Sequence, residues 1–493
     1  MTESIPQQRD PGGLPTLIVG AGEAGLALER DLRRVSSFGL HPIGFLDDDE
    51  RKRKAQTLPQ PVLGTLADLH DVLDMTGAEV VVIAIPSMSH AQIQQLSLAA
   101  AAHGVTVRHL PPFLAALQRE IAGTDMRSLH VGSLIGRPEM HVVSRAAAET
   151  VAGKRVLVTG AGGSIGSELC RQLYGFGPAE LVLLDHDESN LHRLQLDIWG
   201  EALLDTDNVI VADIRDAERI HQVFREQRPQ IVFHAAALKH LPVLERHPCE
   251  GVKSNVRGTE NLIEAAIAHE VERFVLISTD KAANPTSVLG ATKRLGEMLL
   301  DRYRGTATKL CAVRFGNVLG SRGSLLPVLR HQLVAGADVT VTHPDVTRFF
   351  MTIEEAVGLV LEAARMADDA ATYVLDMGEP VRIVDLVHNY ADMLNVSDVR
   401  FRFTGLRPGE KLEEELFGHD EDKMSSPHPR IFMARPTAPL PGFRAQLHDL
   451  YEAAAHNRPD EVFWHLRGLV PEYTPTPRLV PAMASTAPYP DDY

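Results

Sequence analysis

The stretch Gly160-Ala161-Gly162-Gly163-Ser164-Ile165-Gly166 decides the fold of the larger part of this chain. It follows the run from Lys154 to Thr159, which predicts a strand, and it leads into a helical pattern that begins near Ser167. Its glycine spacing lets the backbone approach a pyrophosphate, and the N-terminus of the next helix favours an anion. The stretch therefore predicts the entry of a doubly wound α/β domain that binds a dinucleotide; the alternative is a glycine turn kept only for packing.

The residues that follow refine the choice of dinucleotide. The strand from Leu181 to Leu184 ends at Asp185, about 20 residues beyond Gly166, where an acid bonds the adenosine ribose. An acid there repels a 2′-phosphate and no arginine follows at once, so NAD is favoured over NADP. Small residues after the strand at 231–233 let the cofactor lie against the backbone, and Asp213 could bond the adenine edge. The predicted cofactor-binding residues are Gly160, Gly163, Ser164, Ile165, Gly166, Asp185, Asp213, Ile214, Ala235, Ala236 and Lys293.

A second glycine motif lies near the start of the chain. Leu14 to Val19 predicts a strand that runs into Gly20-Ala21-Gly22-Glu23-Ala24-Gly25 and a helix, and the next strand ends in Asp47-Asp48-Asp49. This domain either holds a nucleotide or only docks or regulates. The fold class predicted for the whole chain is α/β, with two Rossmann-like doubly wound parallel-sheet domains in tandem. The predicted division is a disordered leader (1–13), an N-terminal Rossmann-like domain (14–121), a linker (122–153), a catalytic domain (154–435), a helical extension (436–471) and a disordered Pro-rich tail (472–493).

Composition excludes several classes of protein. The 493 residues carry a formal charge of -16, which argues against a nucleic-acid binder. Three scattered cysteines are too few for a disulfide framework or a zinc site, and no metal is predicted. No apolar run approaches the ~20 residues of a membrane helix, and no signal-peptide layout opens the sequence. These features predict a cytoplasmic protein without an integral membrane segment.

The stretch from Ser278 to Lys293, STDKAANPTSVLGATK, gathers the side chains suited to catalysis. It follows the apolar strand at 273–277, so Thr279, Asp280 and Lys281 are expected at the carboxyl end of that strand, where open α/β sheets place ligands. Pro285 is a helix-start signal, and Leu289 and Lys293 fall on one face of the following helix. An isolated tripeptide of this kind is more often a loop with solvated charges.

Further polar residues predict a substrate cradle. Glycines and polar groups follow the strand at 310–313, and guanidinium forks match the geometry of a diphosphate. The predicted substrate-binding residues are Lys239, Asn317, Arg322, Ser324, Arg348, Arg407 and Glu410. Singly, each arginine is more often a surface residue. His234 and His240 are expected to be structural, because no carboxylate or cysteine lies at metal-ligand spacing. Asn255 either bonds backbone near the site or is an ordinary helix residue.

These motifs together resemble a known family. TGAGGSIGSELCRQL, HAAALKHLPVLE, ISTDKAANPTSVLGATKR, RFGNVLGSRGSLLPV, TRFFMTIEEA and LRPGEKL follow one another as in the extended short-chain dehydrogenase/reductases, within them the nucleotide-sugar 4,6-dehydratases of capsular polysaccharide biosynthesis. The resemblance covers roughly Lys154 to Met433. Long members usually carry N-terminal membrane helices, and this chain looks like a soluble version of them. Short-chain dehydrogenases also place a tyrosine four residues before the active-site lysine, where this chain has Leu289.

The resemblance implies a reaction and residue roles. It implies that NAD takes a hydride from C4 of a UDP-sugar such as UDP-N-acetylglucosamine, that water is eliminated across C5 and C6, and that the hydride returns to C6. Lys281 would remove the C5 proton, Asp280 would protonate the departing hydroxyl, Thr279 would bond the C4 oxygen and Lys293 the nicotinamide ribose. With Leu289 in place of tyrosine, the C4 base is Asp280 acting through Thr279, or water. A nucleotide-sugar epimerase and a non-catalytic nucleotide-sugar sensor or assembly partner remain alternatives, and a homo-oligomer is expected.

Overall fold

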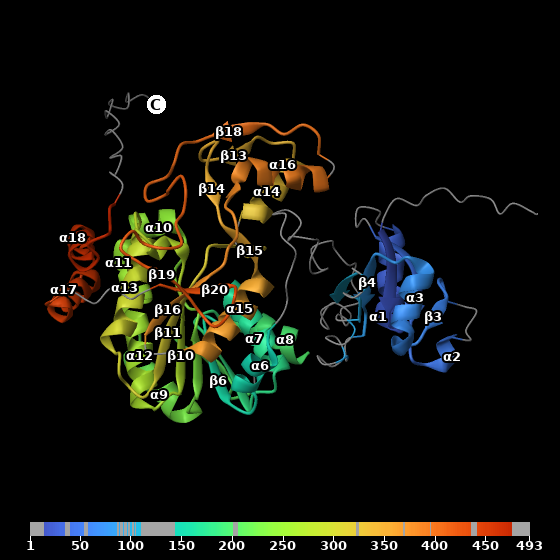
Figure 1. Ribbon diagram of the computed structural model, residues 1–493, viewed down its shortest axis with the longest axis horizontal. Coiled ribbons are helices and arrows are strands. Elements are labelled where there is room, and N and C mark those ends of the chain that lie inside the picture. Colours follow the sequence, from blue (N-terminus) through green and yellow to red (C-terminus); the bar gives the residue numbers. More distant parts are fainter. Residues whose placement is uncertain are drawn as a thin grey trace, which may run out of the picture. The chain divides into compact units, whose positions relative to one another are not determined.

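The computed structural model describes most of the chain, which divides into two compact units (Figure 1). The units are Met1–His130 with His192–Leu204, and Val131–Leu191 with Asp205–Tyr493. The described residues are 14–34, 40–53, 58–85, 143–200, 206–321, 325–367, 370–394, 396–434 and 441–475, with 88, 92, 96, 99, 100, 103 and 105–109. Each unit is built on a parallel sheet, which confirms the predicted fold class.

The first unit contains a parallel sheet whose strand order is β3-β2-β1-β4-β5. Its elements are β1 (Leu14–Val19), α1 (Glu23–Arg34), β2 (Leu40–Leu46), α2 (Glu50–Arg53), β3 (Val62–Gly64), α3 (Leu69–Thr76), β4 (Val80–Ile83) and β5 (Thr106–His109). Apolar side chains of the central strands are buried on both faces, as parallel strands require. The glycine motif forms the turn between β1 and α1, where Asp47 Oδ2 accepts from the Ala21 N–H at 2.8 Å. The sequence did not predict β3, which is only three residues long.

The second unit is organised around a nine-stranded sheet. Its order is β19 (Lys423–Ser425), β20 (Ile431–Ala434), β16 (Ala371–Leu375), β11 (Lys309–Arg314), β10 (Arg273–Ile277), β9 (Ile231–His234), β6 (Arg155–Thr159), β7 (Glu180–Asp185) and β8 (Val209–Val211). From β16 to β8 all neighbours are parallel, and β20 and β19 pair antiparallel. The chain leaves β6 first towards β7 and later returns to β9. This switch in direction opens a crevice beyond the carboxyl ends of β6 and β9, where such sheets bind ligands.

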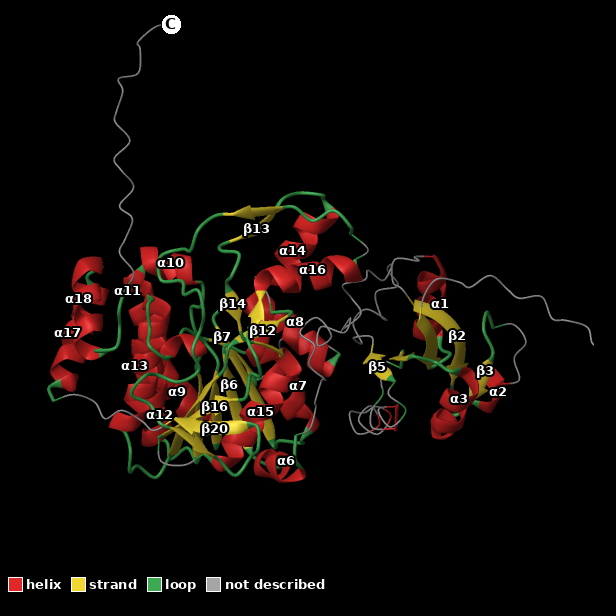
Figure 2. Ribbon diagram, turned by 45° about the horizontal axis from the view of Figure 1, so that its top comes forward, coloured by secondary structure: helices red, strands yellow, loops and turns green. Residues whose placement is uncertain are grey.

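Helices cover both faces of this sheet (Figure 2). On one face α15 (Ile353–Met366) packs against α7 (Ser164–Gly175) and α6 (Arg145–Val151). On the other, α12 (Thr259–Ala268) packs against α9 (Ala217–Gln227) and α13 (Val288–Arg302). The other helices of this part of the chain are α8 (Glu188–Trp199), α10 (Leu241–Arg246), α11 (Pro248–Gly251), the π-helix η5 (Val252–Gly258) and the 3₁₀ turn η6 (Asp280–Ala282).

A smaller part with its own apolar core follows β11. It contains three two-stranded sheets, β12 (Asn317–Leu319) with β15 (Phe350–Thr352), β13 (Val339–Val341) with β18 (Phe401–Phe403), and β14 (Thr347–Arg348) with β17 (Val381–Arg382). Helices α14 (Leu325–Val334) and α16 (Ile383–Met393) complete it, and leucines of α14 are buried together with Leu386 and Val387 of α16. This is the smaller C-terminal part that the fold class predicted.

Two helix starts differ from the sequence predictions. Helix α13 begins at Val288 because Ser287 is its N-cap and accepts from the Gly290 N–H, so Pro285 lies before the helix instead of opening it. Helix α7 begins at Ser164, three residues before the predicted start, because Gly163 already serves as its N-cap.

The ends of the second unit also differ from expectation. The range predicted as a linker contains α6, while Gly136-Arg137-Pro138 lies outside the described residues, as does the predicted leader. The helical extension is α17 (Phe443–Ala455) and α18 (Pro459–Leu469). The predicted disordered tail begins too early, because Glu472 pairs with Arg294 at 2.7 Å and Tyr473 is buried in the core. Within the described residues, no helix is both long and apolar enough to cross a membrane.

Candidate active site

Two adjoining cavities lie beyond the carboxyl ends of β6, β9 and β10. The first, here the cofactor cavity, has a volume of about 680 Å³ and is lined by the glycine turn, Asp185, Asp213, Ile214, Arg215 and residues 235–240 among others. The second, here the reaction cavity, has a volume of about 520 Å³ and is lined by Thr279, Lys281, Leu289, Lys293, Asn317 and others. Gly163, Ser164 and Lys239 line both, so one extended ligand can run from the first cavity into the second.

The glycine turn leaves no room for larger residues. Gly160 has a φ of +66°, which L residues rarely adopt, and a Cβ on Gly166 would lie 2.0 Å from the Gly160 carbonyl oxygen. The turn therefore brings the backbone and the N-terminus of α7 to the edge of the cofactor cavity, an arrangement suited to a pyrophosphate.

We expect Gly166→Ala to remove dinucleotide binding, because the turn must open to relieve the clash with the Gly160 carbonyl oxygen. Thermal unfolding with and without NAD measures this, and the NAD-dependent rise in Tm should disappear. Gly468→Ala, in α18, is the matched control, since its Cβ would meet only the flexible end of the Gln446 side chain, at 3.3 Å. A full NAD-dependent shift in Gly166→Ala would contradict the assigned role of the turn.

Asp185 and Asp213, the two acids predicted to bind the cofactor, both line the cofactor cavity. Asp185 at the end of β7 accepts from the Gly162 N–H at 2.9 Å through Oδ2 and from the Asp187 N–H through Oδ1, which fixes its carboxylate beside the turn. Asp213 is held by both ends of the Arg215 guanidinium. Burial alone would raise the pKa of Asp213, but the bonds from Arg215 outweigh it and lower that pKa. The sequence did not single out Arg215, which also donates to Glu250 at 3.0 Å.

The motif Thr279, Asp280 and Lys281 forms one bonded group at the end of β10. Asp280 Oδ1 accepts from Thr279 Oγ1 at 2.8 Å and from Lys281 Nζ at 3.0 Å, and the Asp280 side chain is fully buried. Its Oδ2 has no hydrogen-bond partner among the described residues. Thr279 and Lys281 line the reaction cavity whereas Asp280 lies behind them. The carboxylate therefore communicates with the cavity through its two neighbours.

Asn317 and Glu414 complete the surroundings of Lys281. Lys281 Nζ donates to Asn317 Oδ1 at 3.2 Å and lies 3.8 Å from Glu414 Oε1. Burial alone would lower the pKa of Lys281, but the charges of Asp280 and Glu414 outweigh it and raise that pKa. Burial also raises the pKa of Glu414. The sequence analysis missed Glu414, because it lies in the acidic run Glu413-Glu414-Glu415 and nothing in that run marks the middle residue as buried.

Lys293 and Leu289 lie on the face of α13 that borders the reaction cavity. Lys293 Nζ donates to the Ile277 carbonyl at 2.7 Å, and burial lowers the pKa of Lys293 to about 8. Leu289 is 6% exposed, and no tyrosine is among the described residues that line this cavity. The predicted spacing on one helix face thus matches the structure.

Neighbouring polar residues have structural partners. His234 is fully buried between Thr159 Oγ1 and Thr259 Oγ1, and burial lowers its pKa to about 3, so the ring is neutral. Asn255, on the π-helix, donates to the Leu238 carbonyl and accepts from the Leu238 N–H. It therefore fixes the backbone beside both cavities, which selects the first of the two alternatives for this residue.

The predicted substrate residues divide into three sets. Lys239 and Asn317 line the reaction cavity. Arg322 and Ser324 lie outside the described residues. Arg348, Arg407 and Glu410 line neither cavity: Arg348 donates to Glu410 at 2.8 Å and to the Thr347 and Leu412 carbonyls, and the Arg407 N–H donates to Glu410. A diphosphate role for Arg348 would require it to leave these partners, and it stays a prediction.

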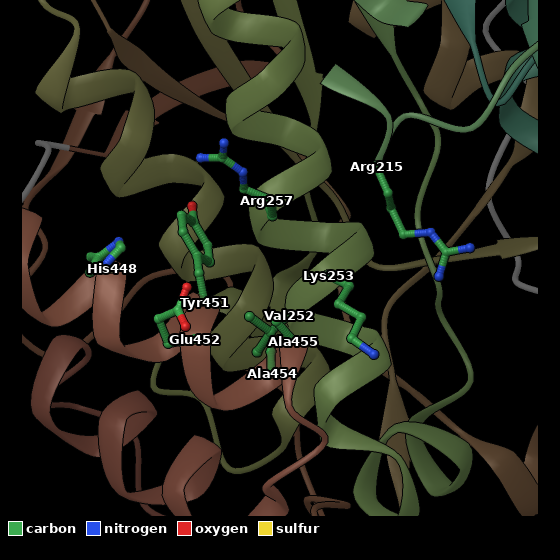
Figure 3. Close-up of a pocket in the computed structure, with 9 residues that line it drawn as sticks. All are labelled: Arg215, Val252, Lys253, Arg257, His448, Tyr451, Glu452, Ala454 and Ala455. Atoms are coloured by element: carbon green, nitrogen blue, oxygen red, sulfur yellow. The ribbon is translucent and has the colours of Figure 1, made fainter. Parts of the chain in front are cut away.

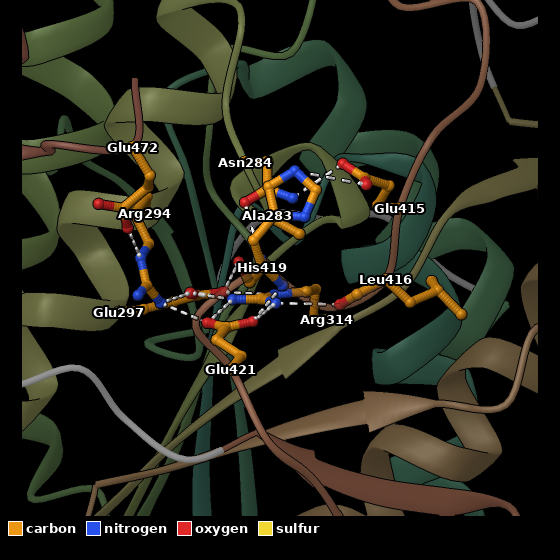
Figure 4. A network of polar contacts seen from close by, with 12 residues as sticks. Ala283, Asn284, Arg294, Glu297, Arg314, Glu415, Leu416, His419, Glu421 and Glu472 are labelled. Carbon is orange, nitrogen blue, oxygen red and sulfur yellow. Dashed lines mark hydrogen bonds and ion pairs between the residues drawn. The ribbon is translucent and has the colours of Figure 1, made fainter. Parts of the chain in front are cut away.

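A buried ion network lies behind the strand ends (Figure 4). Arg314, at the end of β11, donates to Glu297 at 2.6 Å, to Glu421 at 2.7 Å and to the Leu416 carbonyl. Ser278, immediately before Thr279, donates to Glu297 at 2.6 Å. The network therefore ties the end of β10 to α13 and to the loop that follows Glu414.

A third cavity of about 500 Å³ lies between α17 and the π-helix (Figure 3). Its lining includes the basic residues Arg215, Lys253 and Arg257, and each of these pairs with a carboxylate. Arg215 pairs with Asp213 and Glu250, Lys253 pairs with Glu250, and Arg257 pairs with Glu260. The Arg257 guanidinium also stacks over the Tyr451 ring, with 5.1 Å between Cζ and the ring centroid. The contact between Arg257 and Tyr451 joins α17 of the C-terminal extension to the π-helix.

Comparison with known proteins places this site in a family. The model of the family described as "Polysaccharide biosynthesis protein" matches residues 156–436, and the model described as "CoA-binding domain" matches residues 6–111. The chain belongs to the polysaccharide biosynthesis protein family. This family lies within the extended short-chain dehydrogenase/reductases, so the family predicted from the motifs is confirmed.

Relatives of known name support the same placement. The probable polysaccharide biosynthesis protein EpsC of Bacillus subtilis is 39% identical over 88% of this chain and 73% of its own length. A UDP-N-acetylglucosamine 4,6-dehydratase (inverting) of Campylobacter jejuni is 29% identical over 58% of this chain and 84% of its own. The structure of Pen from Bacillus thuringiensis, 32% identical, covers 57% of this chain and 86% of Pen with a TM-score of 0.52. Relatives of the family match both units of this chain.

Proposed function

We propose that the chain is an NAD-dependent nucleotide-sugar 4,6-dehydratase that converts UDP-N-acetylglucosamine into a UDP-4-keto-6-deoxy sugar for polysaccharide biosynthesis. The observation that carries the proposal is the bonded group of Thr279, Asp280 and Lys281 at the wall of the reaction cavity. An epimerase needs the C4 chemistry but no base beside C5. The named dehydratase relative agrees with this choice.

The cofactor cavity fits NAD by its chemistry. The turn from Gly160 to Gly166 and the N-terminus of α7 would hold the pyrophosphate, Asp185 the adenosine ribose and Lys293 the nicotinamide ribose. A bound NAD would supply the acceptor for the C4 hydride and its later donor to C6. The chain itself has to move the protons.

The geometry supports a closed route for these protons. Thr279 Oγ1 can accept the O4 proton while its own proton passes to Asp280 Oδ1, 2.8 Å away. Lys281, as a free amine, removes the C5 proton and delivers it to the departing C6 hydroxyl, which leaves as water. The proton held by Asp280 then crosses the 3.0 Å to Lys281 Nζ and is delivered to C5. Asp280 thus acts through Lys281, since its burial separates it from the hydroxyl that the resemblance assigns to it.

Isotope tracing tests the proposal. The full chain would be incubated with NAD and UDP-N-acetylglucosamine deuterated at C4, with other UDP- and dTDP-sugars in parallel, and the products identified by mass spectrometry and NMR. A dehydratase yields a product that has lost one water and carries deuterium at C6. Deuterium at C4 of an isomerised sugar without loss of water would instead identify an epimerase. Recovery of every sugar unchanged would contradict both enzymes and favour a sensor.

We expect Leu289→Tyr to keep or raise turnover, because Leu289 borders the reaction cavity one turn before Lys293 and a phenol there could take the O4 proton. Leu289→Met is the matched control, with similar volume and no hydroxyl. Initial rates of product formation compare the three proteins. Loss of turnover in a folded Leu289→Tyr protein alone would show that the site is arranged around an apolar side chain.

A further inference from the structure

Glu414 is a buried carboxylate with no assigned role. It is 8% exposed, its Oε1 lies 3.8 Å from Lys281 Nζ, and its Oε2 has no hydrogen-bond partner among the described residues. Glu413 and Glu415 on either side are more exposed, and Glu415 pairs with Lys411. The chain therefore directs one carboxylate of an acidic run at the amine that faces the sugar.

The groups around Lys281 in the structure stabilise its ammonium form, which cannot act as a base. Nζ donates to the carboxylate of Asp280 and to the carbonyl oxygen of Asn317, and Glu414 is a second carboxylate nearby. Burial alone would lower the pKa of Lys281, but Asp280 and Glu414 outweigh it and raise that pKa. An ammonium cannot remove the C5 proton, so one proton has to leave Nζ before elimination.

We propose that Glu414 takes this proton from Lys281 and holds it, so that Lys281 meets the sugar as a free amine. The inference rests on the proposed dehydratase function. The transfer turns the ammonium and carboxylate into an amine and a carboxylic acid, and no proton enters or leaves the cluster. It requires Nζ and Oε1 to close from 3.8 Å to a hydrogen bond of roughly 2.8 Å.

Glu414 suits the task better than Asp280. Asp280 has to be ionised to accept the proton that arrives through Thr279, so it cannot also store the one from Lys281. Burial favours the neutral form of the Glu414 carboxyl. Its Oε2 accepts no hydrogen bond from the described residues, so no other donor competes with the proton from Lys281.

Other charges around the cluster are already compensated. Arg348 on β14 faces Lys281 and Glu414, and Lys411 faces Glu414. Arg348 pairs with Glu410 at 2.8 Å and Lys411 with Glu415 at 3.2 Å. Asp280, Arg348 and Lys411 are thus the other charged groups that act on Lys281 and Glu414.

Labelling of Lys281 tests the inference without substrate or cofactor. Reductive methylation with formaldehyde and cyanoborohydride reacts only with a free amine, and mass spectrometry of the Lys281 peptide gives its rate against pH. An ammonium without an internal acceptor loses about tenfold in rate for each pH unit below its pKa. Proton transfer to Glu414 predicts a rate that is constant across neutral pH in the wild type. Surface Lys154, paired with Glu272, is the internal reference.

Two variants identify the acceptor. Glu414→Gln should lower the constant labelling rate at least about tenfold, whereas Asp280→Asn should keep it. An unchanged rate in Glu414→Gln, or a rate lost in Asp280→Asn, would overturn the proposal. If Glu414→Gln does not fold, Asp280→Asn and Glu414→Asp still decide it, because a retained carboxylate at 414 should preserve part of the constant rate.

Kinetics separate this inference from the proposed function. Glu414→Gln should lower kcat for dehydration about 10²-fold near neutrality, with a rise as pH increases that the wild type lacks. Glu413→Gln removes the same charge from an exposed position and should leave both kcat and its pH dependence unchanged. A wild type that removes water from no sugar defeats the proposed function, while the labelling result still decides whether Glu414 accepts the proton.

Discussion

Lys281→Met is expected to lower dehydration by about 10²- to 10⁴-fold, the range contributed by general acid–base catalysis. Methionine keeps the length of the side chain, but it can neither remove the C5 proton nor relay one from Asp280 Oδ1, which lies 3.0 Å from Nζ. The measurement is the initial rate of water loss from UDP-N-acetylglucosamine, with incorporation of deuterium from D₂O at C5 as a second readout. Both should fall together.

The control for this variant has to show that the site is intact. Lys281→Met leaves the buried Asp280 carboxylate with one donor fewer, so thermal unfolding and NAD binding should be measured beside turnover. Lys154→Met removes a lysine from a surface pair far from both cavities and should retain wild-type turnover. A folded Lys281→Met protein with more than a tenth of wild-type turnover would rule out Lys281 as the base.

The sequence predicted the parts of the molecule that local pattern determines. The pattern of a strand followed by a glycine turn predicted both parallel sheets. The acid predicted about 20 residues after Gly166 is Asp185 at the end of β7, and it lies beside the Gly162 N–H. Thr279, Lys281, Leu289 and Lys293 reach one cavity because the end of β10 and the first turns of α13 adjoin it. Strand ends and helix faces follow from residue order, so these predictions needed no tertiary information.

Tertiary contacts decided what the sequence left open. Glu414 cannot be distinguished from Glu413 by type or spacing, and only its burial against Lys281 gives it a role. Arg348 was predicted to hold a diphosphate because a guanidinium matches the geometry of phosphate. In the structure its guanidinium instead pairs with Glu410 of the same chain. The tail was predicted to be disordered from its proline content, but its start is held by an ion pair between Glu472 and Arg294 and by burial of Tyr473 in the core. Ion pairs between residues that are far apart in the sequence leave no periodic pattern in it, so the sequence alone does not predict them.

Arg314→Met is expected to destabilise the fold by about 3–5 kcal/mol, because it leaves buried carboxylates without their main partner. Arg314 is fully buried, and Glu297 and Glu421 are 2% and 3% exposed. Burial alone would raise the pKa of Glu421, but Arg314 outweighs it and lowers that pKa. Because net stabilities are only about 5–15 kcal/mol, this one change could remove much of the stability of the second unit. Urea unfolding gives the free energy.

Two controls and the pH dependence distinguish this mechanism from lost packing. Arg219→Met breaks only a 3.9 Å surface pair and should cost about 0–1 kcal/mol. Arg314→Met with Glu421→Gln removes one charge of each sign and should recover part of the loss. Since the folded-state pKa of Glu421 lies below its ordinary 4.5, its contribution is complete above that pH and is lost as the pH falls through the folded-state value. The gap between wild type and Arg314→Met should therefore narrow in acid, and a gap that stays constant would assign the loss to packing instead of charge.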